Sequence, residues 1–234
     1  MRLAKASAVA GAAALLISAM TALPAARAQQ DADKKVAGGG VTVKGWTGKV
    51  DTGNRQGLTI NDSKLAPEGS GMRLQTGAAA LYWNPANVGK GDFSVKATFT
   101  EPKQSINHAH PYGVFIGGKG LDTDTPQALY CAAYRNGTYI VRGFSGGKPF
   151  QVVGKPMPNE AIKRAETPET QVVQDVTLSV KGDKVDCTVN GTSVWSAAKA
   201  DVVGAGKLDS TDGITGIRVS HNSDAIVTNF AVGK

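Results

Sequence analysis

Two tyrosines and an arginine flank a predicted tight turn and have the side chains best suited to bind a ligand. Tyr130, Tyr134 and Arg142 lie in the stretch 128–144, ALYCAAYRNGTYIVRGF, around Asn136-Gly137. Asn-Gly between two runs of β-forming residues is the strongest short-range signal of a β-hairpin. An aromatic ring offers a flat apolar surface to the C–H face of a sugar, and a guanidinium offers a rigid fork of donors to hydroxyl or carboxylate oxygens. The three residues are therefore candidates for carbohydrate binding.

The length of the loop decides which side chains of this hairpin share a face. A two-residue loop would put Arg142 opposite Cys131, on the face that also carries Leu129. A three-residue loop, 135–137, with Gly137 in the left-handed conformation, separates the two kinds of side chain better. Because a buried arginine without a partner is costly, we predict the three-residue loop. One face then carries Leu129, Cys131, Ala133, Tyr139 and Val141, and the other carries Tyr130, Tyr134, Thr138, Ile140 and Arg142.

Histidine and aspartate pairs raise the question of a metal site. His108 and His110 precede the apolar run 112–118, and His221 is the third histidine of the chain. A protein metal site needs a third and usually a fourth ligand, and Asp122 and Asp124 more often start turns. We therefore expect no metal and no cofactor. We place His110 and His221 at the rim of the ligand-binding face.

Carboxylates suited to glycoside hydrolysis are scarce. The five glutamates all lie outside the predicted strands, whereas Asp175 and Asp186 lie in or next to strands. A glycosidase of ordinary design needs two carboxyl groups roughly 5–10 Å apart on rigid elements. Nothing in the sequence shows that the two aspartates face one site, so we predict no catalytic residues.

Cys131 and Cys187 both lie in predicted strands. An exported setting permits a disulfide between them. Two small buried thiols that fill core positions are the alternative, because cysteine often plays that part. The sequence leaves both possibilities open, since a bridge requires Cα atoms within about 7 Å of each other.

Residues 1–28 have the organisation of a signal peptide. Arg2 and Lys5 form a positive start, 8–20 (AVAGAAALLISAM) is apolar, and 26–28 (ARA) supplies the small residues of a cleavage site. The apolar run is shorter than the roughly 20 residues that a membrane-spanning helix needs. We therefore expect export to the periplasm or the outside of a bacterial cell, with no membrane attachment after cleavage.

The charge of the remaining chain is mildly basic. Three of the 26 basic residues and none of the 19 acidic ones lie in the predicted signal peptide, so the formal charge falls from +7 to +4. No cluster of lysines and arginines stands out, and we expect no nucleic-acid partner. The sequence does not indicate an oligomeric state.

The rest of the chain is typical of an all-β protein. Residues 29–40 are polar and glycine-rich, which predicts a flexible lead-in, and 41–234 form one domain. Only 160–166 (EAIKRAE) has a helical pattern, and the neighbouring prolines confine it to a short turn. Short alternating runs separated by Gly, Asn, Asp and Pro predict strands around 58–60, 72–74, 81–83, 93–100, 112–118, 128–144, 176–180, 185–195, 217–221 and 226–232. These elements predict an antiparallel β-sandwich of two sheets with one short helical turn.

Several of these strands carry a family resemblance. The closing segments 213–221 (GITGIRVSH) and 226–232 (IVTNFAV), together with 112–118, 139–142 and 185–195, resemble strands of concanavalin A-like lectin and glucanase jelly rolls. The nearest group is that of exported bacterial proteins with a keto-disaccharide hydrolase type domain. This resemblance implies carbohydrate as the ligand, on the concave face of a sheet, and acidic residues there in hydrolytic members. The chain departs at that point, because 93–100 and 129–135 hold no carboxylate.

Three functions follow as hypotheses. The first is an exported, lectin-like β-sandwich that binds carbohydrate through Tyr130, Tyr134 and Arg142 without catalysis. The second is a glycoside hydrolase or a related carbohydrate-active enzyme. The third is a periplasmic protein-interaction module whose aromatic face contacts another protein. The scarcity of glutamate in strands favours the first hypothesis over the second.

Overall fold

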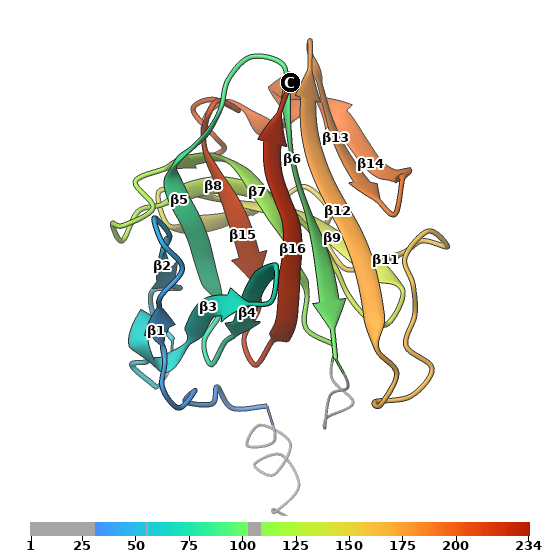
Figure 1. Cartoon of the computed structure of the whole chain (residues 1–234). Coiled ribbons are helices and arrows are strands. Elements are labelled where there is room, and N and C mark those ends of the chain that lie inside the picture. Colours follow the sequence, from blue (N-terminus) through green and yellow to red (C-terminus); the bar gives the residue numbers. More distant parts are fainter. Residues whose placement is uncertain (1–30, 55, 103–108) are drawn as a thin grey trace, which may run out of the picture. The chain divides into compact units, whose positions relative to one another are not determined.

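A computed structural model of the chain describes residues 31–54, 56–102 and 109–234, and all the elements below belong to the unit 33–234 (Figure 1). The strands form two sheets, which are antiparallel except for the pair β1–β3. Sheet A contains, in spatial order, β1 (Gly40–Val41), β3 (Lys64–Glu68), β4 (Gly71–Gln75), β16 (Asp224–Gly233), β6 (Phe93–Glu101), β12 (Val172–Lys181), β13 (Lys184–Val189) and β14 (Thr192–Ala198). Sheet B contains β10 (Lys148–Gln151), β9 (Thr138–Ser145), β8 (Gln127–Ala133), β7 (Tyr112–Lys119), β15 (Gly213–Val219), β5 (Ala80–Gly89) and β2 (Thr47–Val50), with β11 (Met157–Pro158) paired to β9.

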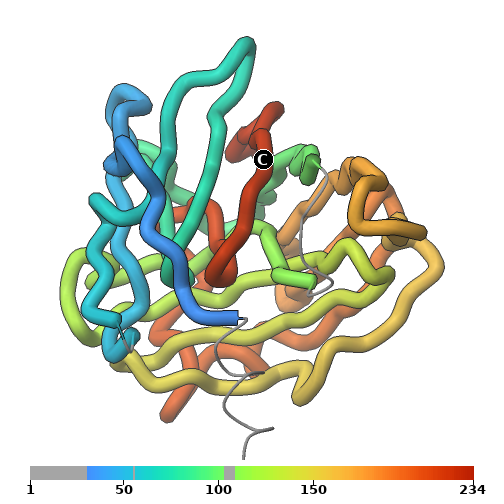
Figure 2. Tube along the Cα trace, turned by 90° about the horizontal axis from the view of Figure 1, so that it is seen from below, coloured from blue at the N-terminus to red at the C-terminus, as the bar shows by residue number. Residues whose placement is uncertain are grey.

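The two sheets pack face to face around one core. Figure 2 shows β16 (red) and the strands β7 to β9 (yellow-green) in different layers. In β6 the predicted alternation holds, since Phe93, Val95, Ala97 and Phe99 are all buried in the core between the sheets. The β-sandwich predicted from the sequence is therefore confirmed.

The first Asn-Gly hairpin has the predicted three-residue loop. Tyr134 N donates to Thr138 O at 2.8 Å, which leaves 135–137 as the loop, and Gly137 has a φ of +87°. In the resulting register Tyr130 lies opposite Arg142, and Cys131 lies opposite Val141. The side chains sort as predicted, because Cys131 and Val141 belong to the core between the sheets and Tyr130 does not.

The second Asn-Gly hairpin differs from the simplest expectation. Asn190 and Gly191 form a two-residue loop with φ values of +51° and +85°, so a regular ladder would put Cys187 opposite Val194. A β-bulge after Cys187 shifts the register, and Cys187 lies opposite Trp195 instead. The extra residue of a bulge is invisible in a pattern of strict alternation.

Helical structure lies elsewhere than the sequence predicts. The described helical turns are η1 (Ile60–Asp62), where a strand was expected, and α2 (Lys199–Val202). Asp62 caps η1 by accepting a hydrogen bond from Thr59 N at 2.8 Å. At 160–166, where a short helical turn was expected, the chain makes one turn closed by Ile162 N and Asn159 O at 3.1 Å and does not continue as a helix. Lys163 N and O bond the buried side chain of Gln174 instead. None of the described helices has the length and apolar character required to span a lipid bilayer.

The stretch before the first strand is held against the sandwich. Lys34 N donates to Asn222 Oδ1 at 3.0 Å, and Val36 N donates to Asp62 O at 3.0 Å. The flexible lead-in expected for 29–40 is thus hydrogen-bonded over its described part. The predicted signal peptide, 1–28, lies outside the described residues.

A disulfide joins the two sheets through the core. Cys131 on β8 and Cys187 on β13 are bonded, with their Cα atoms 6.0 Å apart and a sequence separation of 56. Of the two possibilities that the sequence left open, the structure has the bridge. It restrains two strands that belong to opposite layers.

Reduction of this disulfide should destabilise the protein. A bridge that closes a loop of 56 residues restricts the unfolded chain by roughly 4 kcal/mol in the chain-entropy model. We expect reductant to lower the melting temperature by roughly 10 °C, measured by circular dichroism. The double variant Cys131→Ala/Cys187→Ala is the control and should not respond to reductant. Two thiols that titrate in the unreduced, denatured protein would contradict the bridge.

The left-handed residue of the first hairpin should be specific for glycine. A Cβ atom at Gly137 would lie 3.7 Å from its nearest neighbour, an ordinary contact, so Gly137→Ala probes only the positive φ. We expect a loss of about 1 kcal/mol and a melting temperature about 2–4 °C lower. Gly154→Ala is the matched control, because Gly154 does not have a positive φ and a Cβ atom there would also make only an ordinary contact, 3.6 Å from Gln151 Oε1. Equal stability of the two variants would argue against the three-residue loop.

Candidate functional site

The face of sheet B that points away from sheet A, called the outer face below, carries a second apolar cluster. It comprises the buried residues Leu81, Trp83, Phe115, Leu121, Ala128, Tyr130, Ala132 and Ile140, with Tyr134, Phe144 and Ile214 partly buried against them. Strand β7 is buried on both faces, as its continuous apolar run predicts. The outer face is thus an aromatic and aliphatic surface supported by rigid central strands.

Arg218 on β15 is the main charged group of this surface. Its guanidinium lies 5.4 Å from the ring centroid of Tyr130 and 5.0 Å from that of Phe144. Its Nη1 and Nη2 atoms donate to the two carboxylate oxygens of Asp51, the second at 2.7 Å. Burial opposes the charge of Arg218, but Asp51 outweighs it and the pKa of the guanidinium is raised. The bidentate ion pair therefore keeps a cation over two neighbouring aromatic rings, whose centroids are 6.0 Å apart.

Tyr130, Tyr134 and Arg142 lie together on the outer face, as predicted. Tyr130 is 8% exposed, whereas Tyr134 and Arg142 are half-buried. Burial raises the pKa of Tyr134, the nearby Tyr130 raises it further, and Arg142 lowers it. Arg142 Nη2 donates to Gly154 O at 3.4 Å, and its buried Nε has no partner among the described residues. The guanidinium of Arg142 is therefore less neutralised than that of Arg218.

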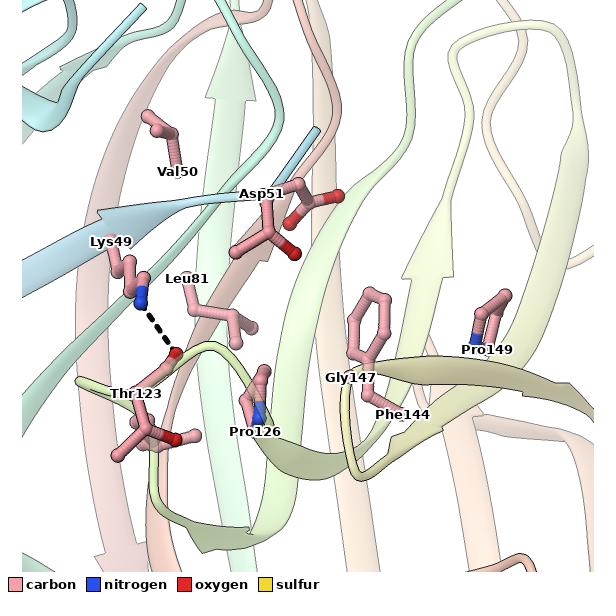
Figure 3. A pocket seen from close by; sticks show the side chains of 11 residues that line it. Lys49, Val50, Asp51, Leu81, Thr123, Pro126, Phe144, Gly147 and Pro149 are labelled. Atoms are coloured by element: carbon pink, nitrogen blue, oxygen red, sulfur yellow. Dashed lines mark hydrogen bonds between the residues drawn. The ribbon is translucent and has the colours of Figure 1, made fainter. Parts of the chain in front are cut away.

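A cavity of about 240 Å³ opens on the outer face beside these residues (Figure 3). We call it the Phe144 cavity, after the phenyl ring in its wall. Its apolar lining comes from Leu81, Leu121, Pro126, Phe144 and Pro149, and its polar lining includes Lys49, Asp51 and Thr123. Tyr130, Tyr134 and Arg142 do not line it. Arg142 and Phe144 are two residues apart on β9, so their Cα atoms are about 7 Å apart. Arg142 therefore lies next to the cavity wall that Phe144 forms.

Lys49 closes one side of the Phe144 cavity. Its Nζ donates to the backbone oxygens of Asp122 and Thr123 and lies 2.8 Å from Asp124 Oδ1 (Figure 3). These contacts tie β2 to the turn that follows β7. Asp122 and Asp124 thus belong to a turn, the role that the sequence favoured for them, and Lys49 holds this turn.

His110 and His221 lie close to each other, just before β7 and just after β15. Their rings meet edge to face with centroids 4.5 Å apart, and His221 Nδ1 is 2.8 Å from Asp33 Oδ1. Tyr112 pairs with Ala133 across β7 and β8, so His110 lies two residues beyond this pair, beside 134–135, and is 1% exposed. The two histidines thus contact each other and the lead-in, and their role at the rim of a ligand-binding face stays a prediction.

Asp175 and Asp186 lie farther apart than the two carboxyl groups of a glycosidase of ordinary design. Both side chains lie on the face of sheet A opposite the core, and Asp186 is paired with Ser179, four residues from Asp175 along β12. The two carboxylates are thus roughly 13 Å apart. Burial raises the pKa of Asp186, but hydrogen bonds from Ser193, Lys184 and Thr188 outweigh it and the pKa is lowered.

Glu68 and Glu101 correct the expectation that no glutamate lies in a strand, because they are the last residues of β3 and β6. Glu101 is fully buried, with Oε2 4.0 Å from Arg135 Nε. Burial raises the pKa of the neighbouring Tyr112, and the charge of Glu101 raises it further. Arg135 also donates to the carbonyl oxygens of Thr167, Pro168 and Thr170. This buried group ties the hairpin loop to the sandwich.

Sequence reasoning missed Arg218, Asp51 and Phe144. A signal for Arg218 was present, because it stands between the apolar Ile217 and Val219 and alternation directs it to the opposite face. Asp51 had no such signal. It follows the short strand β2 and meets Arg218 across 167 residues of sequence.

No protein-family model matches this sequence, and no curated protein is similar to it in sequence. Similar solved structures exist. The carbohydrate-binding module CBM66 from Bacillus subtilis is 13% identical, with 83% of this chain and 99% of that chain covered and a TM-score of 0.53. A protein of unknown function with a galectin-like fold from Bacillus subtilis is 15% identical, with 82% and 90% covered and a TM-score of 0.54.

A looser match is the catalytic domain of an endo-1,3-beta-glucanase (laminarinase) from Thermotoga petrophila RKU-1. It is 12% identical, covers 83% of this chain and 92% of that chain, and has a TM-score of 0.45. At such identities a likeness shows the fold alone. The chain has a galectin-like and concanavalin-like β-sandwich fold, as its resemblance to jelly rolls implied.

Proposed function

We propose that the unit 33–234 is a carbohydrate-binding module whose ligand occupies the Phe144 cavity. The observation that carries this proposal is the lining of the cavity, which combines a phenyl ring and aliphatic walls with Lys49, Asp51 and Thr123. A sugar ring has apolar C–H faces and a polar edge of hydroxyl groups, so it suits a cavity of this mixed character. The carbohydrate-binding module CBM66 shares the fold and supports the same ligand class.

The size of the cavity suits one sugar ring. A buried cavity of about 150 Å³ can hold a six-membered aromatic ring, and the Phe144 cavity measures about 240 Å³. A longer oligosaccharide would extend along β9 toward Arg142 and Tyr134, because these lie on the same face. Arg142 would donate to hydroxyl or carboxylate oxygens of that second unit, and Tyr134 would stack on its ring.

Binding without chemistry is favoured over hydrolysis. Among the described residues that line the Phe144 cavity, Asp51 supplies the carboxylate, and both of its oxygens accept from Arg218. A glycosidase of ordinary design needs a second carboxyl about 5–10 Å away to act as acid, base or nucleophile. The ion pair leaves Asp51 better suited to fix the cavity wall than to react.

Export is part of the proposal. The disulfide between Cys131 and Cys187 favours an oxidising compartment such as the periplasm or the outside of the cell. The predicted signal peptide, 1–28, points the same way. A module in either place would meet the glycans of a cell surface or the surroundings.

Removal of the Phe144 ring should abolish most of the binding. A glycan array would first identify the glycans that the wild type binds. We expect Phe144→Ala to lower the affinity for each of them at least tenfold, about 1.4 kcal/mol, measured by isothermal titration calorimetry. Met157→Ala is the control, because it removes an exposed apolar side chain from β11 on the same sheet and should bind normally. Unchanged affinity in Phe144→Ala, with its melting temperature preserved, would rule out this cavity as the ligand site.

Ligand length should separate the two parts of the outer face. Tyr134→Ala and Arg142→Ala should each lower the affinity for a tetrasaccharide at least fivefold. The affinity for the corresponding monosaccharide should not change, since only the longer ligand reaches these two side chains. Phe144→Ala should weaken both. Equal losses for the two lengths in all three variants would show that one sugar unit contacts the whole surface. A loss of folding in either variant would instead assign that side chain to the core.

A further inference from the structure

A second cavity, of about 530 Å³, lies between β16 of sheet A and the end of β5 in sheet B. We call it the Trp46 cavity, after an indole in its wall. It shares no lining residue with the Phe144 cavity, and none of the described residues that line it is charged. Its lining includes Trp46, Asn84, Asn87, Thr228, Asn229 and Phe230. The two cavities therefore differ in electrostatic character.

Two aromatic rings form the apolar part of the Trp46 cavity. Trp46 and Phe230 meet edge to face, with ring centroids 4.9 Å apart and planes inclined by 79°. Both side chains are half-buried, so each ring retains surface that a ligand can cover. Because the two rings support each other, this surface is held in place before a ligand arrives.

Three amide side chains form the polar part. Asn229 Nδ2 donates to Thr98 Oγ1 at 3.2 Å, and that hydroxyl in turn donates to Asp175 Oδ1 at 2.6 Å. Because the hydroxyl proton of Thr98 goes to Asp175, the atom of Asn229 that bonds this hydroxyl must be a donor, which is the amide nitrogen. The amide oxygen of Asn229 is then left to accept from a ligand. The orientation of this amide is thus fixed by the protein.

The other two amides supply donors. Asn84 Oδ1 accepts from Ala86 N at 3.0 Å, so its amide nitrogen is available to a ligand. The side chain of Asn87 makes no hydrogen bond to any described residue, although it lines the cavity. The lining therefore combines donors and acceptors without a net charge. Hydroxyl groups match such a surface, because each can both donate and accept.

The backbone around Asn229 disfavours a peptide strand as the ligand. Strand β4 pairs with only the first part of β16, up to Val227. On the other side of β16 the register shifts between Thr228 and Ala231, and Asn229 has a φ of +53°. An added strand needs a regular run of N–H and C=O groups along the sheet edge, and the bulge interrupts that run.

We propose that the Trp46 cavity is a second binding site, specific for an uncharged sugar. Its rings would cover the C–H face of the sugar, and its amides would bond the hydroxyl groups. This site does not depend on the Phe144 cavity, because the two have no residue in common. A protein with two such sites would bind multivalent glycans with avidity.

The test compares neutral oligosaccharides with acidic ones. Neutral gluco-, manno- and galacto-tetraoses and uronate tetramers of the same length would be titrated into the full exported protein by calorimetry. Asn87→Leu is the principal variant, because it removes the amide at nearly constant volume and breaks no hydrogen bond within the described protein. We expect a loss of affinity of at least tenfold for the neutral tetraose that binds best. Val88→Ala is the matched control, since it changes an exposed neighbour that does not line the cavity.

Trp46→Ala and Trp46→Phe supply a second measure. We expect loss of neutral-sugar binding in the alanine variant and partial rescue in the phenylalanine variant. Lack of binding of every neutral tetraose by the wild type, or unchanged binding in both Asn87→Leu and Trp46→Ala, would overturn the inference. Loss of neutral-sugar binding in Phe144→Ala alone would assign the sugar to the Phe144 cavity. That result would refute the site in the Trp46 cavity and leave the proposed function standing.

An extended peptide is the competing ligand and has its own outcome. A random hexapeptide library would be offered to the wild type and to Asn87→Leu under the same conditions. Selection of peptides that Asn87→Leu no longer retains would assign the Trp46 cavity to peptide recognition and overturn the sugar assignment. Failure to retain peptides, together with tenfold weaker neutral-sugar binding in the variant, would support it.

Discussion

The hydrogen bond between Tyr134 N and Thr138 O closes the loop 135–137 and holds β8 and β9 in one register, on which both faces of sheet B depend. A slip of one residue in a strand pair exchanges the two faces completely. Here the register directs Cys131 into the core, where it can reach Cys187, and directs Tyr130 and Arg142 to the outer face. The disulfide and the proposed binding surface therefore have a common origin.

A cation on an apolar face needs local compensation. Arg218 obtains it from Asp51 through two hydrogen bonds and from the rings of Tyr130 and Phe144. An uncompensated buried guanidinium would be costly, so the ion pair makes the aromatic surface compatible with a charge. Because Asp51 is occupied in this way, the outer face carries a neutralised cation within a largely apolar surface.

The β-sandwich places its two cavities on different structural features. The Phe144 cavity lies over strands of sheet B and is bounded by Lys49, which holds the turn after β7. The Trp46 cavity lies where β4 stops pairing with β16, and its lining also includes residues of β5 in sheet B. The first has charged groups in its lining and the second has amides, so one fold offers two chemically different surfaces. Both are supported by strands, which hold side chains more accurately than loops do.

Local patterns in the sequence determined the longer strands, the hairpin loop and the side-chain content of each hairpin face, but not the short strands β1, β2, β3, β10 and β11. Strand alternation in 93–100 and the Asn-Gly turn at 136–137 have that power because the period of two and the left-handed glycine are properties of a few adjacent residues. Local patterns did not reveal the helical turn at Ile60–Asp62, the bulge after Cys187 or the absence of a helix at 160–166, where Gln174 supplies the hydrogen bonds.

Only the tertiary structure decided which distant side chains meet. The pairs Arg218–Asp51, Cys131–Cys187, His110–His221 and Trp46–Phe230 each join segments far apart in the chain. Their formation depends on the order and stacking of strands in two sheets, which no local pattern encodes. The sequence by itself therefore determined that Tyr130, Tyr134 and Arg142 share a surface. Which cavities adjoin that surface, and which charges are already paired there, follow from the packing of the whole sandwich.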